Sequence, residues 1–139
     1  MAVLDLNPDL VPTSVLAIKC DVADDVSVRT AVEQVARELG GIDVVVKNAG
    51  IGAHGTVADN DDTKWHRASD INVVGAARVS RAALLYLRQS PAVTIVNTCS
   101  IAATAGLPAR ALYAATKGAV RALTFSMAAD HVREGIRID

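Results

Sequence analysis

Short apolar runs alternate with helix-patterned segments along this chain. The runs are rich in valine and isoleucine, and polar or turn-forming residues separate them. Between them, apolar residues recur at spacings of three or four, which indicates amphipathic helices. Strands are expected at 2–6, 15–20, 42–46, 93–97 and 136–139, and helices from Asp24 or Asp25, from Asp61 or Asp62, from Ile71 to Arg88, and over 112–133. This alternation predicts βαβ units with right-handed crossovers on one parallel sheet.

The composition fits one α/β domain and argues against several classes of partner. Of the 139 residues, 51% are hydrophobic but only 3% are aromatic, so valine, alanine, leucine and isoleucine must build the core. Such a make-up is typical of parallel α/β layers. A net charge of −1 without a basic run argues against a nucleic-acid partner. No apolar run is long enough to span a membrane and the N-terminus lacks a signal-type pattern, so we expect a cytoplasmic protein with no membrane partner.

The cysteines and histidines predict neither a disulfide nor a metal centre. Cys20 and Cys99 have no CxxC spacing, and each lies at or just beyond the end of an expected strand, so both are expected to be buried free thiols. His54, His66 and His131 are far apart and show no ligand-like spacing.

A tyrosine and a lysine lie one turn apart in the last long helix. Tyr113 and Lys117 are at i and i+4, so both side chains project from the same face. An ammonium group that close favours the phenolate and suits the tyrosine to proton transfer. Ser100, on the loop before this helix, offers a hydroxyl that would hold a substrate oxygen. By itself, the pair is also compatible with a tyrosine at the core edge beside a solvated lysine.

Two further motifs give this segment a family resemblance. Asn48-Ala49-Gly50 follows an expected strand, and Asn72 lies in the run Asp-Ile-Asn-Val-Val-Gly. With Ser100, Tyr113 and Lys117, in this order, they resemble the short-chain dehydrogenase/reductase family over essentially the whole chain. The resemblance implies an α/β fold with a Rossmann-like, doubly wound parallel sheet over residues 1–139, which binds NAD or NADP. It also implies an oxidoreductase that transfers a hydride between this cofactor and a small-molecule secondary alcohol or ketone.

The resemblance assigns catalytic roles to four side chains. Tyr113 would exchange the hydroxyl proton, and Lys117 would stabilise the phenolate and hold the nicotinamide ribose. Ser100 would bind and orient the substrate oxygen together with Tyr113. Asn72 would kink its helix and hold a water connected to the lysine, as part of a proton relay; the alternative is a plain helix residue.

The same resemblance implies a set of cofactor contacts. Asp5 ends the first expected strand, where the family places an acid that accepts hydrogen bonds from the adenosine ribose. A carboxylate there repels a 2′-phosphate, so NAD is favoured over NADP. The alternative for Asp5 is a solvated loop residue. The full set of implied cofactor contacts is Asp5, Asp21, Val22, Asn48, Ala49, Gly50, Tyr113 and Lys117.

A literal GxGxxG match at residues 50–55 is not taken as the dinucleotide fingerprint, because the pattern of residues 56–62 predicts a loop and not a helix. The family's own glycine-rich loop, after its first strand, has no counterpart in the chain. By resemblance, residue 2 lies in the family's second strand and residue 139 in its sixth, which predicts a fragment of a longer enzyme. In the family strand order 3-2-1-4-5-6-7, the missing first strand would separate 2–6 from 42–46 and leave two unpaired edges.

Two features bear on packing and assembly. Lys47 stands where the family usually has asparagine, and a lysine at the end of a buried strand needs a partner or a route to solvent. The helices over 73–88 and 112–133 are rich in small residues that would allow helices of two subunits to approach. With the resemblance, this predicts a homodimer or homotetramer, using Ala76, Ala77, Ala82, Ala83, Ala114, Ala115, Ala119 and Ala122.

A second functional hypothesis stays open at this point. The absent glycine-rich loop is compatible with a non-catalytic Rossmann-like binding or assembly module, whereas the intact asparagine, serine, tyrosine and lysine set favours an enzyme. The substrate is also open, and sugars, sugar acids, steroids and small diols all fit the pattern.

Overall fold

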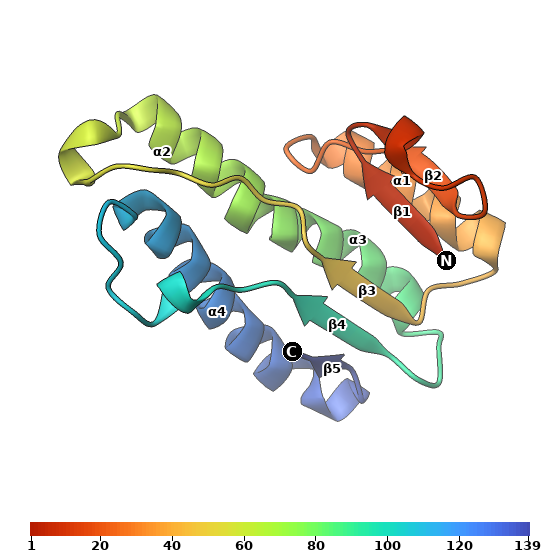
Figure 1. The fold of residues 1–139 in the computed structure, drawn as a ribbon. Helices are drawn as coiled ribbons and strands as arrows, with labels where there is room; N and C mark the ends of the chain where they lie inside the picture. Colours follow the sequence, from red (N-terminus) through yellow and green to blue (C-terminus); the bar gives the residue numbers. More distant parts are fainter.

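The computed structural model describes all residues, 1–139, as five strands and four α-helices. Short 3₁₀ turns lie at Pro8–Leu10, Val57–Asp59, Ile101–Ala103 and Val132–Glu134, and a π-helical turn spans Asp70–Val74. The strands are β1 (Ala2–Asp5), β2 (Leu16–Lys19), β3 (Val44–Lys47), β4 (Thr94–Asn97) and β5 (Arg137–Ile138), and the helices are α1 (Asp25–Leu39), α2 (Asp62–Ser69), α3 (Gly75–Leu87) and α4 (Ala111–His131). The predicted α/β alternation is confirmed (Figure 1).

All strand pairs are parallel, but the strands form two separate groups. β1 pairs with β2, and β4 lies between β3 and β5. No strand pairs with the free edge of β1 or of β3, and this gap is where the family resemblance puts a first strand (Figure 1). On β3, Val44 and Val46 are 57% and 64% exposed. The predicted Rossmann-like sheet with a missing central strand is therefore observed.

The helix ends follow local signals in the sequence. Asp24 caps α1, because its side chain accepts hydrogen bonds from the amides of Val26 (2.8 Å) and Ser27 (3.0 Å). The helix ends at Gly40, whose φ of 78° is left-handed and favours glycine. Asp61 caps α2 by accepting a hydrogen bond from the amide of Lys64 (2.9 Å). The sequence predicted one of two adjacent aspartates at the start of each of these helices, and in both helices the first aspartate is the cap.

The core joins the two strand groups through the helices. α1 packs against α3, and Val28, Ala83, Leu87 and Ile95 are completely buried where these elements meet. α4 packs along β4 and β5 and contributes Met127 to the same cluster. Aliphatic and alanine side chains account for almost all of this core, as the low aromatic content predicted.

The middle helical region differs from the prediction. A separate helix was expected to begin at Ile71, but α2, the π-helical turn and α3 form one unbroken helical rod (Figure 1). No proline or helix-ending glycine interrupts residues 62–87, so the chain continues as a helix. The π-helical turn accommodates one extra residue per turn and includes the buried Asn72. A π-helical turn therefore lies where the resemblance implied a kink at Asn72.

Two expectations about burial need correction. Cys20 is a buried free thiol, and burial raises its pKa, but Cys99 is exposed because it lies on the loop beyond β4. Ala82 and Ala83 are 8% and 0% exposed within the chain's own core, so they are not available to a second subunit. None of the helices is long and apolar enough to cross a bilayer.

Candidate active site

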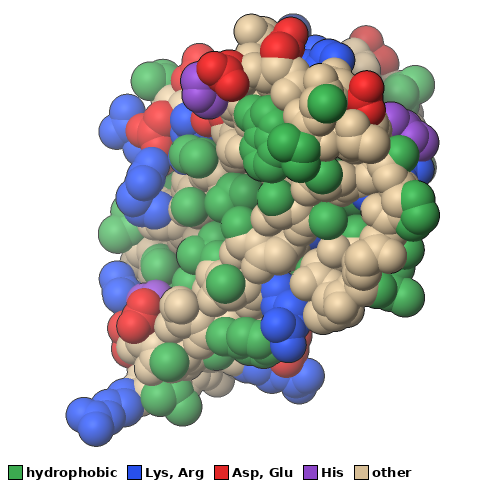
Figure 2. All heavy atoms as spheres, turned by 90° about the vertical axis from the view of Figure 1, so that its left-hand side faces the viewer, with side chains coloured by type: hydrophobic (Ala, Val, Ile, Leu, Met, Phe, Trp, Pro, Cys, Tyr) green, Lys and Arg blue, Asp and Glu red, His purple; other side chains and the backbone are tan.

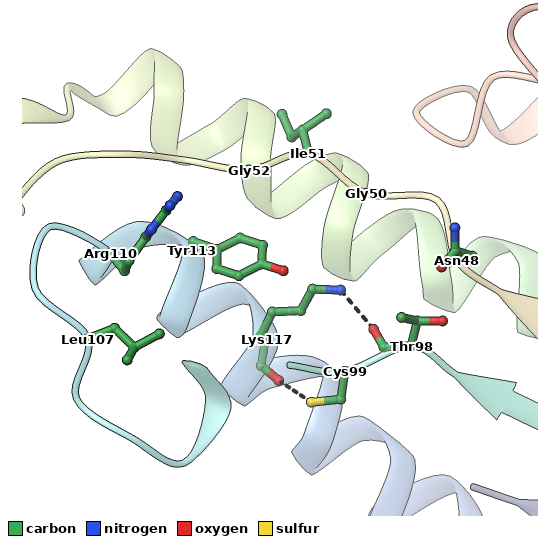
Figure 3. Close-up of a pocket in the computed structure, with 10 residues that line it drawn as sticks. All are labelled: Asn48, Gly50, Ile51, Gly52, Thr98, Cys99, Leu107, Arg110, Tyr113 and Lys117. Carbon is green, nitrogen blue, oxygen red and sulfur yellow. Dashed lines mark hydrogen bonds between the residues drawn. The ribbon is translucent and has the colours of Figure 1, made fainter. Parts of the chain in front are cut away.

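A cavity of about 470 Å³ lies between the carboxyl ends of β3 and β4 and the first turns of α4 (Figure 3). The loop that follows β3 closes one side, and the loop that precedes α4 closes another. The volume is typical of a small-molecule site. Its ten lining residues are Asn48, Gly50, Ile51, Gly52, Thr98, Cys99, Leu107, Arg110, Tyr113 and Lys117.

Lys117 is a buried cation beside the tyrosine. Its side chain is only 6% exposed, and its Nζ donates a 2.7 Å hydrogen bond to the carbonyl of Thr98. The same Nζ lies 5.8 Å from the centroid of the Tyr113 ring, and both side chains reach the cavity from one face of α4 (Figure 3). An ammonium group has three N–H donors, so this arrangement leaves donors for a ligand oxygen. The structure therefore places Tyr113 and Lys117 side by side at the cavity, and their chemical roles stay predictions.

Asn72 is placed behind the cavity and not in its wall. It is 3% exposed, and its Oδ1 accepts a hydrogen bond from the Ile51 amide (2.8 Å). Its Nδ2 donates to the Ile51 carbonyl (2.9 Å) and to the Thr116 hydroxyl (3.0 Å). This side chain therefore fixes the loop after β3 to the turn of α4 that carries Lys117.

Gly50 is required by a close approach at the same place. A Cβ added there would lie 3.1 Å from the Asn72 Oδ1 and 3.9 Å from the Lys117 Nζ. Any side chain at this position would press on the asparagine and lie over the ammonium group. Of the Asn48-Ala49-Gly50 motif, Asn48 and Gly50 line the cavity and the exposed Ala49 does not.

Ser100 is less directly placed than the sequence suggested. Its Oγ accepts a 3.2 Å hydrogen bond from the Ala102 amide at the start of a 3₁₀ turn, and the residue is not among those that line the cavity. The preceding residues, Thr98 and Cys99, do line it, and the Cys99 thiol donates to the Lys117 carbonyl (3.4 Å). The role of Ser100 toward a substrate stays a prediction.

The expected adenosine contacts lie together on the other strand group. Asp5 ends β1, and its Oδ1 accepts a 2.8 Å hydrogen bond from the Asn7 amide. Its carbonyl accepts from the Cys20 amide (2.9 Å), which brings Asp21 and Val22 next to it. The Val22 carbonyl accepts a 3.0 Å hydrogen bond from Arg78 of α3. Asp5, Asp21 and Val22 thus form one cluster, separate from Tyr113 and Lys117.

No helix begins within the GxGxxG match, as predicted. Residues 50–54 are irregular, and α2 starts only at Asp62. Gly55, with a φ of 114°, instead donates its amide to the Ala109 carbonyl (2.9 Å) and forms a bridge with Arg110. Gly55, the last residue of the GxGxxG match, thus connects the two loops that border the cavity.

Arg110 is the only charged residue of the cavity wall that was not predicted from the sequence. The other lining residues that were not predicted are Ile51, Gly52, Thr98, Cys99 and Leu107. Arg110 lines the cavity next to Tyr113 (Figure 3). The spacing of Arg110, Tyr113 and Lys117 is i, i+3 and i+7, which marks one helix face. That stripe was visible in the sequence, but only the long-range bridge to Gly55 turns the start of α4 toward a cavity.

Lys47 has the partner that its position required. Its Nζ donates to the Ala76 carbonyl (3.2 Å) and to the Ser80 hydroxyl, both on α3. No carboxylate forms an ion pair with it, and burial lowers its pKa from 10.5 to about 8. The lysine therefore ties the end of β3 to α3 and keeps clear of the cavity.

Comparisons with known proteins identify the family to which the chain belongs. A family model described as short chain dehydrogenase matches residues 5–139. Meso-2,3-butanediol dehydrogenase from Serratia marcescens is 38% identical over 124 residues, which cover 89% of this chain and 49% of that protein. The chain spans about half the length of the curated relatives that it matches.

Solved structures show the same likeness. An NAD⁺-bound xylitol dehydrogenase is 34% identical with a TM-score of 0.91, and the match covers 99% of this chain and 57% of that one. A ligand-free aldohexose dehydrogenase from Thermoplasma acidophilum is 29% identical with a TM-score of 0.92, covering 99% of this chain and 53% of that one.

Burial of Lys47 predicts a specific dependence of stability on pH. The pKa is about 8 in the folded chain and close to its ordinary 10.5 when unfolded, so between these values the unfolded state binds more protons. The free energy of unfolding should therefore gain a contribution as pH rises from about 8 to 10.5, at most ~3 kcal/mol and less where solvent screens the group. Urea unfolding across this range should show the gain in the wild type and not in Lys47→Met.

Lys19 provides the matched control, because it also ends a strand but is exposed. Lys19→Met should keep the wild-type pH profile. Identical profiles for the wild type and Lys47→Met would contradict the burial of the ammonium group.

Proposed function

Because the chain belongs to the short-chain dehydrogenase family, we propose that the protein containing it is an NAD-dependent dehydrogenase that interconverts a secondary alcohol and a ketone. The observation that carries this proposal is the buried Lys117 ammonium beside Tyr113 in a cavity of small-molecule size. The relatives described above are dehydrogenases by name, one of them solved with NAD⁺. Since the chain covers about half of its relatives, the activity is proposed for the whole protein.

The residues present fit the nicotinamide end of such a cofactor. Lys117 has N–H donors left for ribose hydroxyls, and Gly50 leaves the space over its Nζ free of side chains. Asn48 and Thr98 line the same end of the cavity (Figure 3). When bound, the nicotinamide would supply the hydride chemistry.

The chain's own residues would carry out the proton transfer to and from the substrate oxygen. The Tyr113 hydroxyl would take the proton from an alcohol or return it to a ketone oxygen. Lys117 would stabilise the phenolate form through its positive charge, which burial leaves poorly screened by water. Ser100 would orient the substrate oxygen once its hydroxyl turns from the Ala102 amide. Asn72 would support a proton relay without lining the cavity, because its hydrogen bonds fix Ile51 and Thr116 relative to Lys117.

Asp5 supports a preference for NAD over NADP. Its carboxylate is exposed at the end of β1, beside Asp21 and Val22, where an adenosine ribose would bind. Only one hydrogen bond, from the Asn7 amide, occupies it. A 2′-phosphate there would meet a like charge.

The alternative, a non-catalytic binding module, draws its support from the open edges of β1 and β3. An NADH fluorescence titration separates the two hypotheses. Saturable NADH binding by the full-length protein favours the enzyme, and no binding favours the module.

Assembly into homodimers or homotetramers stays part of the proposal. Apolar side chains remain exposed on the long helices, with Leu85 on α3 62% exposed and Phe125 on α4 59% exposed. Figure 2 shows hydrophobic side chains reaching the surface between charged ones on the side that carries α2. Exposed apolar helix surface of this kind is suited to subunit contacts.

The first test removes only the phenol hydroxyl. In the full-length protein that contains this chain, Tyr113→Phe should lower kcat roughly 10²- to 10⁴-fold, because no other group is positioned to move the hydroxyl proton. NADH binding, followed by fluorescence, should change little. Tyr86→Phe, a change at a tyrosine that packs against the core, should keep wild-type kcat. A Tyr113→Phe protein with wild-type activity would refute the role.

The second test concerns the choice of cofactor. Asp5→Ala should reduce the preference for NAD over NADP, measured as a ratio of kcat/KM values, by roughly tenfold or more, because it removes a like-charge contact. Asp9→Ala, a nearby exposed aspartate, is the control and should leave the ratio unchanged. A wild-type protein that uses NADP as well as NAD would show that Asp5 does not select the cofactor.

A further inference from the structure

Arg110 is a half-buried residue whose guanidinium group has no partner. It lines the cavity beside Tyr113, yet its side chain takes part in none of the hydrogen bonds or ion pairs of the structure (Figure 3). Arg78 shows the usual arrangement for a sheltered arginine. Its side chain is 16% exposed, pairs with Asp70 at 2.8 Å and donates to the Val22 carbonyl at 3.0 Å. An unpaired guanidinium group that faces a cavity is suited to bind an anionic group of a ligand.

The cavity wall carries positive charge only. Arg110 and Lys117 are its charged residues, and none of the ten lining residues is an aspartate or glutamate. A smaller cavity of about 250 Å³, lined in part by the same loop, also has cationic and no acidic side chains, among them Lys64 and Arg67. Such a one-signed cleft attracts anionic ligands.

The position of Arg110 separates it from the cofactor contacts. Along α4, Lys117 follows Tyr113 by one turn, and Arg110 precedes it by about 4.5 Å of helix rise. Asn48 and Thr98 lie at the Lys117 end of the cavity, and Arg110 and Leu107 lie at the other end (Figure 3). An anion on Arg110 would therefore belong to the molecule whose hydroxyl meets Tyr113.

The backbone of Arg110 is held in place. Its bridge to Gly55 and the hydrogen bond from the Gly55 amide to the Ala109 carbonyl (2.9 Å) fix the start of α4. Ala109 adopts a φ of 52°, which is uncommon for a residue with a side chain and persists where surrounding contacts enforce it. A guanidinium group on such an anchored segment is preorganised for bidentate binding of an oxyanion.

We propose that Arg110 binds an anionic group on the substrate, so that the alcohol oxidised at Tyr113 carries an oxyanion such as a carboxylate. This inference rests on the proposed dehydrogenase function and narrows its substrate class to small hydroxy acids and similar anions. Arg110 thereby determines specificity, while Tyr113 and Lys117 carry the chemistry.

The test compares acids with their uncharged methyl esters in the full-length protein. The probes are lactate, 3-hydroxybutyrate and 4-hydroxypentanoate, which place the carboxylate at increasing distance from the hydroxyl. At least one acid should have a higher kcat/KM than its ester. Arg110→Gln should lower kcat/KM for that acid roughly 10- to 100-fold, the loss expected for a charged hydrogen bond, and leave the ester nearly unchanged. For the same acid, the kcat/KM of Arg110→Lys should lie between the wild-type value and that of Arg110→Gln, because lysine keeps the positive charge but lacks the bidentate guanidinium group.

Arg67→Gln is the matched control, because it removes one positive charge near the same loop without lining this cavity. An equal loss in Arg67→Gln and Arg110→Gln would point to long-range attraction and overturn direct contact. If each ester has the same kcat/KM as its acid, for all three acids, the inference about Arg110 is wrong, and the dehydrogenase proposal is unaffected.

A binding measurement decides the inference independently of turnover. Calorimetric titration of each acid into Tyr113→Phe, and into Tyr113→Phe with Arg110→Gln, should show affinity that depends on the arginine. If no alcohol is turned over, the proposed function fails, and these titrations still test Arg110. Equal affinity with and without the arginine, or no binding of any acid, would refute its role.

Discussion

The site depends on one buried amide. The Asn72 side chain joins three parts of the chain that are distant in sequence, because it pairs with both backbone groups of Ile51 and with the Thr116 hydroxyl. Thr116 precedes Lys117 on α4, so the same contacts set the loop after β3 against the ammonium group. Without the amide, a partly buried N–H and C=O at Ile51 would lose their partners, at about 1–3 kcal/mol for each group left unsatisfied. The π-helical turn is the local distortion that accompanies this arrangement.

A second link connects the two halves of the expected cofactor site. Asp5, Asp21 and Val22 lie on the β1–β2 group, whereas Tyr113 and Lys117 lie against the β3–β4–β5 group, and no strand hydrogen bonds run between the groups. Arg78 spans the division, since it binds the Val22 carbonyl on one side and Asp70, at the start of the π-helical turn, on the other. Packing of α1 on α3 completes the connection. Arg81 of α3 also pairs with Asp25 at the start of α1 (2.6 Å), so the relative placement of the two clusters rests on packed helices and on two arginines of α3.

Local patterns predicted much of this structure, and long-range contacts account for what they missed. The strands, the aspartate caps and the pairing of Tyr113 with Lys117 follow from periodicity and i, i+4 geometry, which act within a few residues. The inward position of Arg110 depends on how the loop before α4 meets Gly55, 55 residues earlier than Arg110. The contacts of Asn72, in the π-helical turn, with Ile51 and Thr116 likewise join residues that are 21 and 44 positions apart in the sequence. Nothing in the local sequence specifies such contacts, and only the family resemblance indicated that Asn72 mattered.

The most direct test of this account is the hydrogen exchange of the Ile51 amide, followed by NMR. In the wild type this amide donates to the Asn72 Oδ1 and should exchange slowly for a loop residue. In Asn72→Ala it should exchange roughly tenfold faster or more, the equivalent of about 1.4 kcal/mol of lost protection. Asn60→Ala, which removes another buried asparagine near the end of the same loop, should leave Ile51 protected. An Ile51 amide that exchanges at the same rate with and without the Asn72 side chain would show that this amide does not hold the site together.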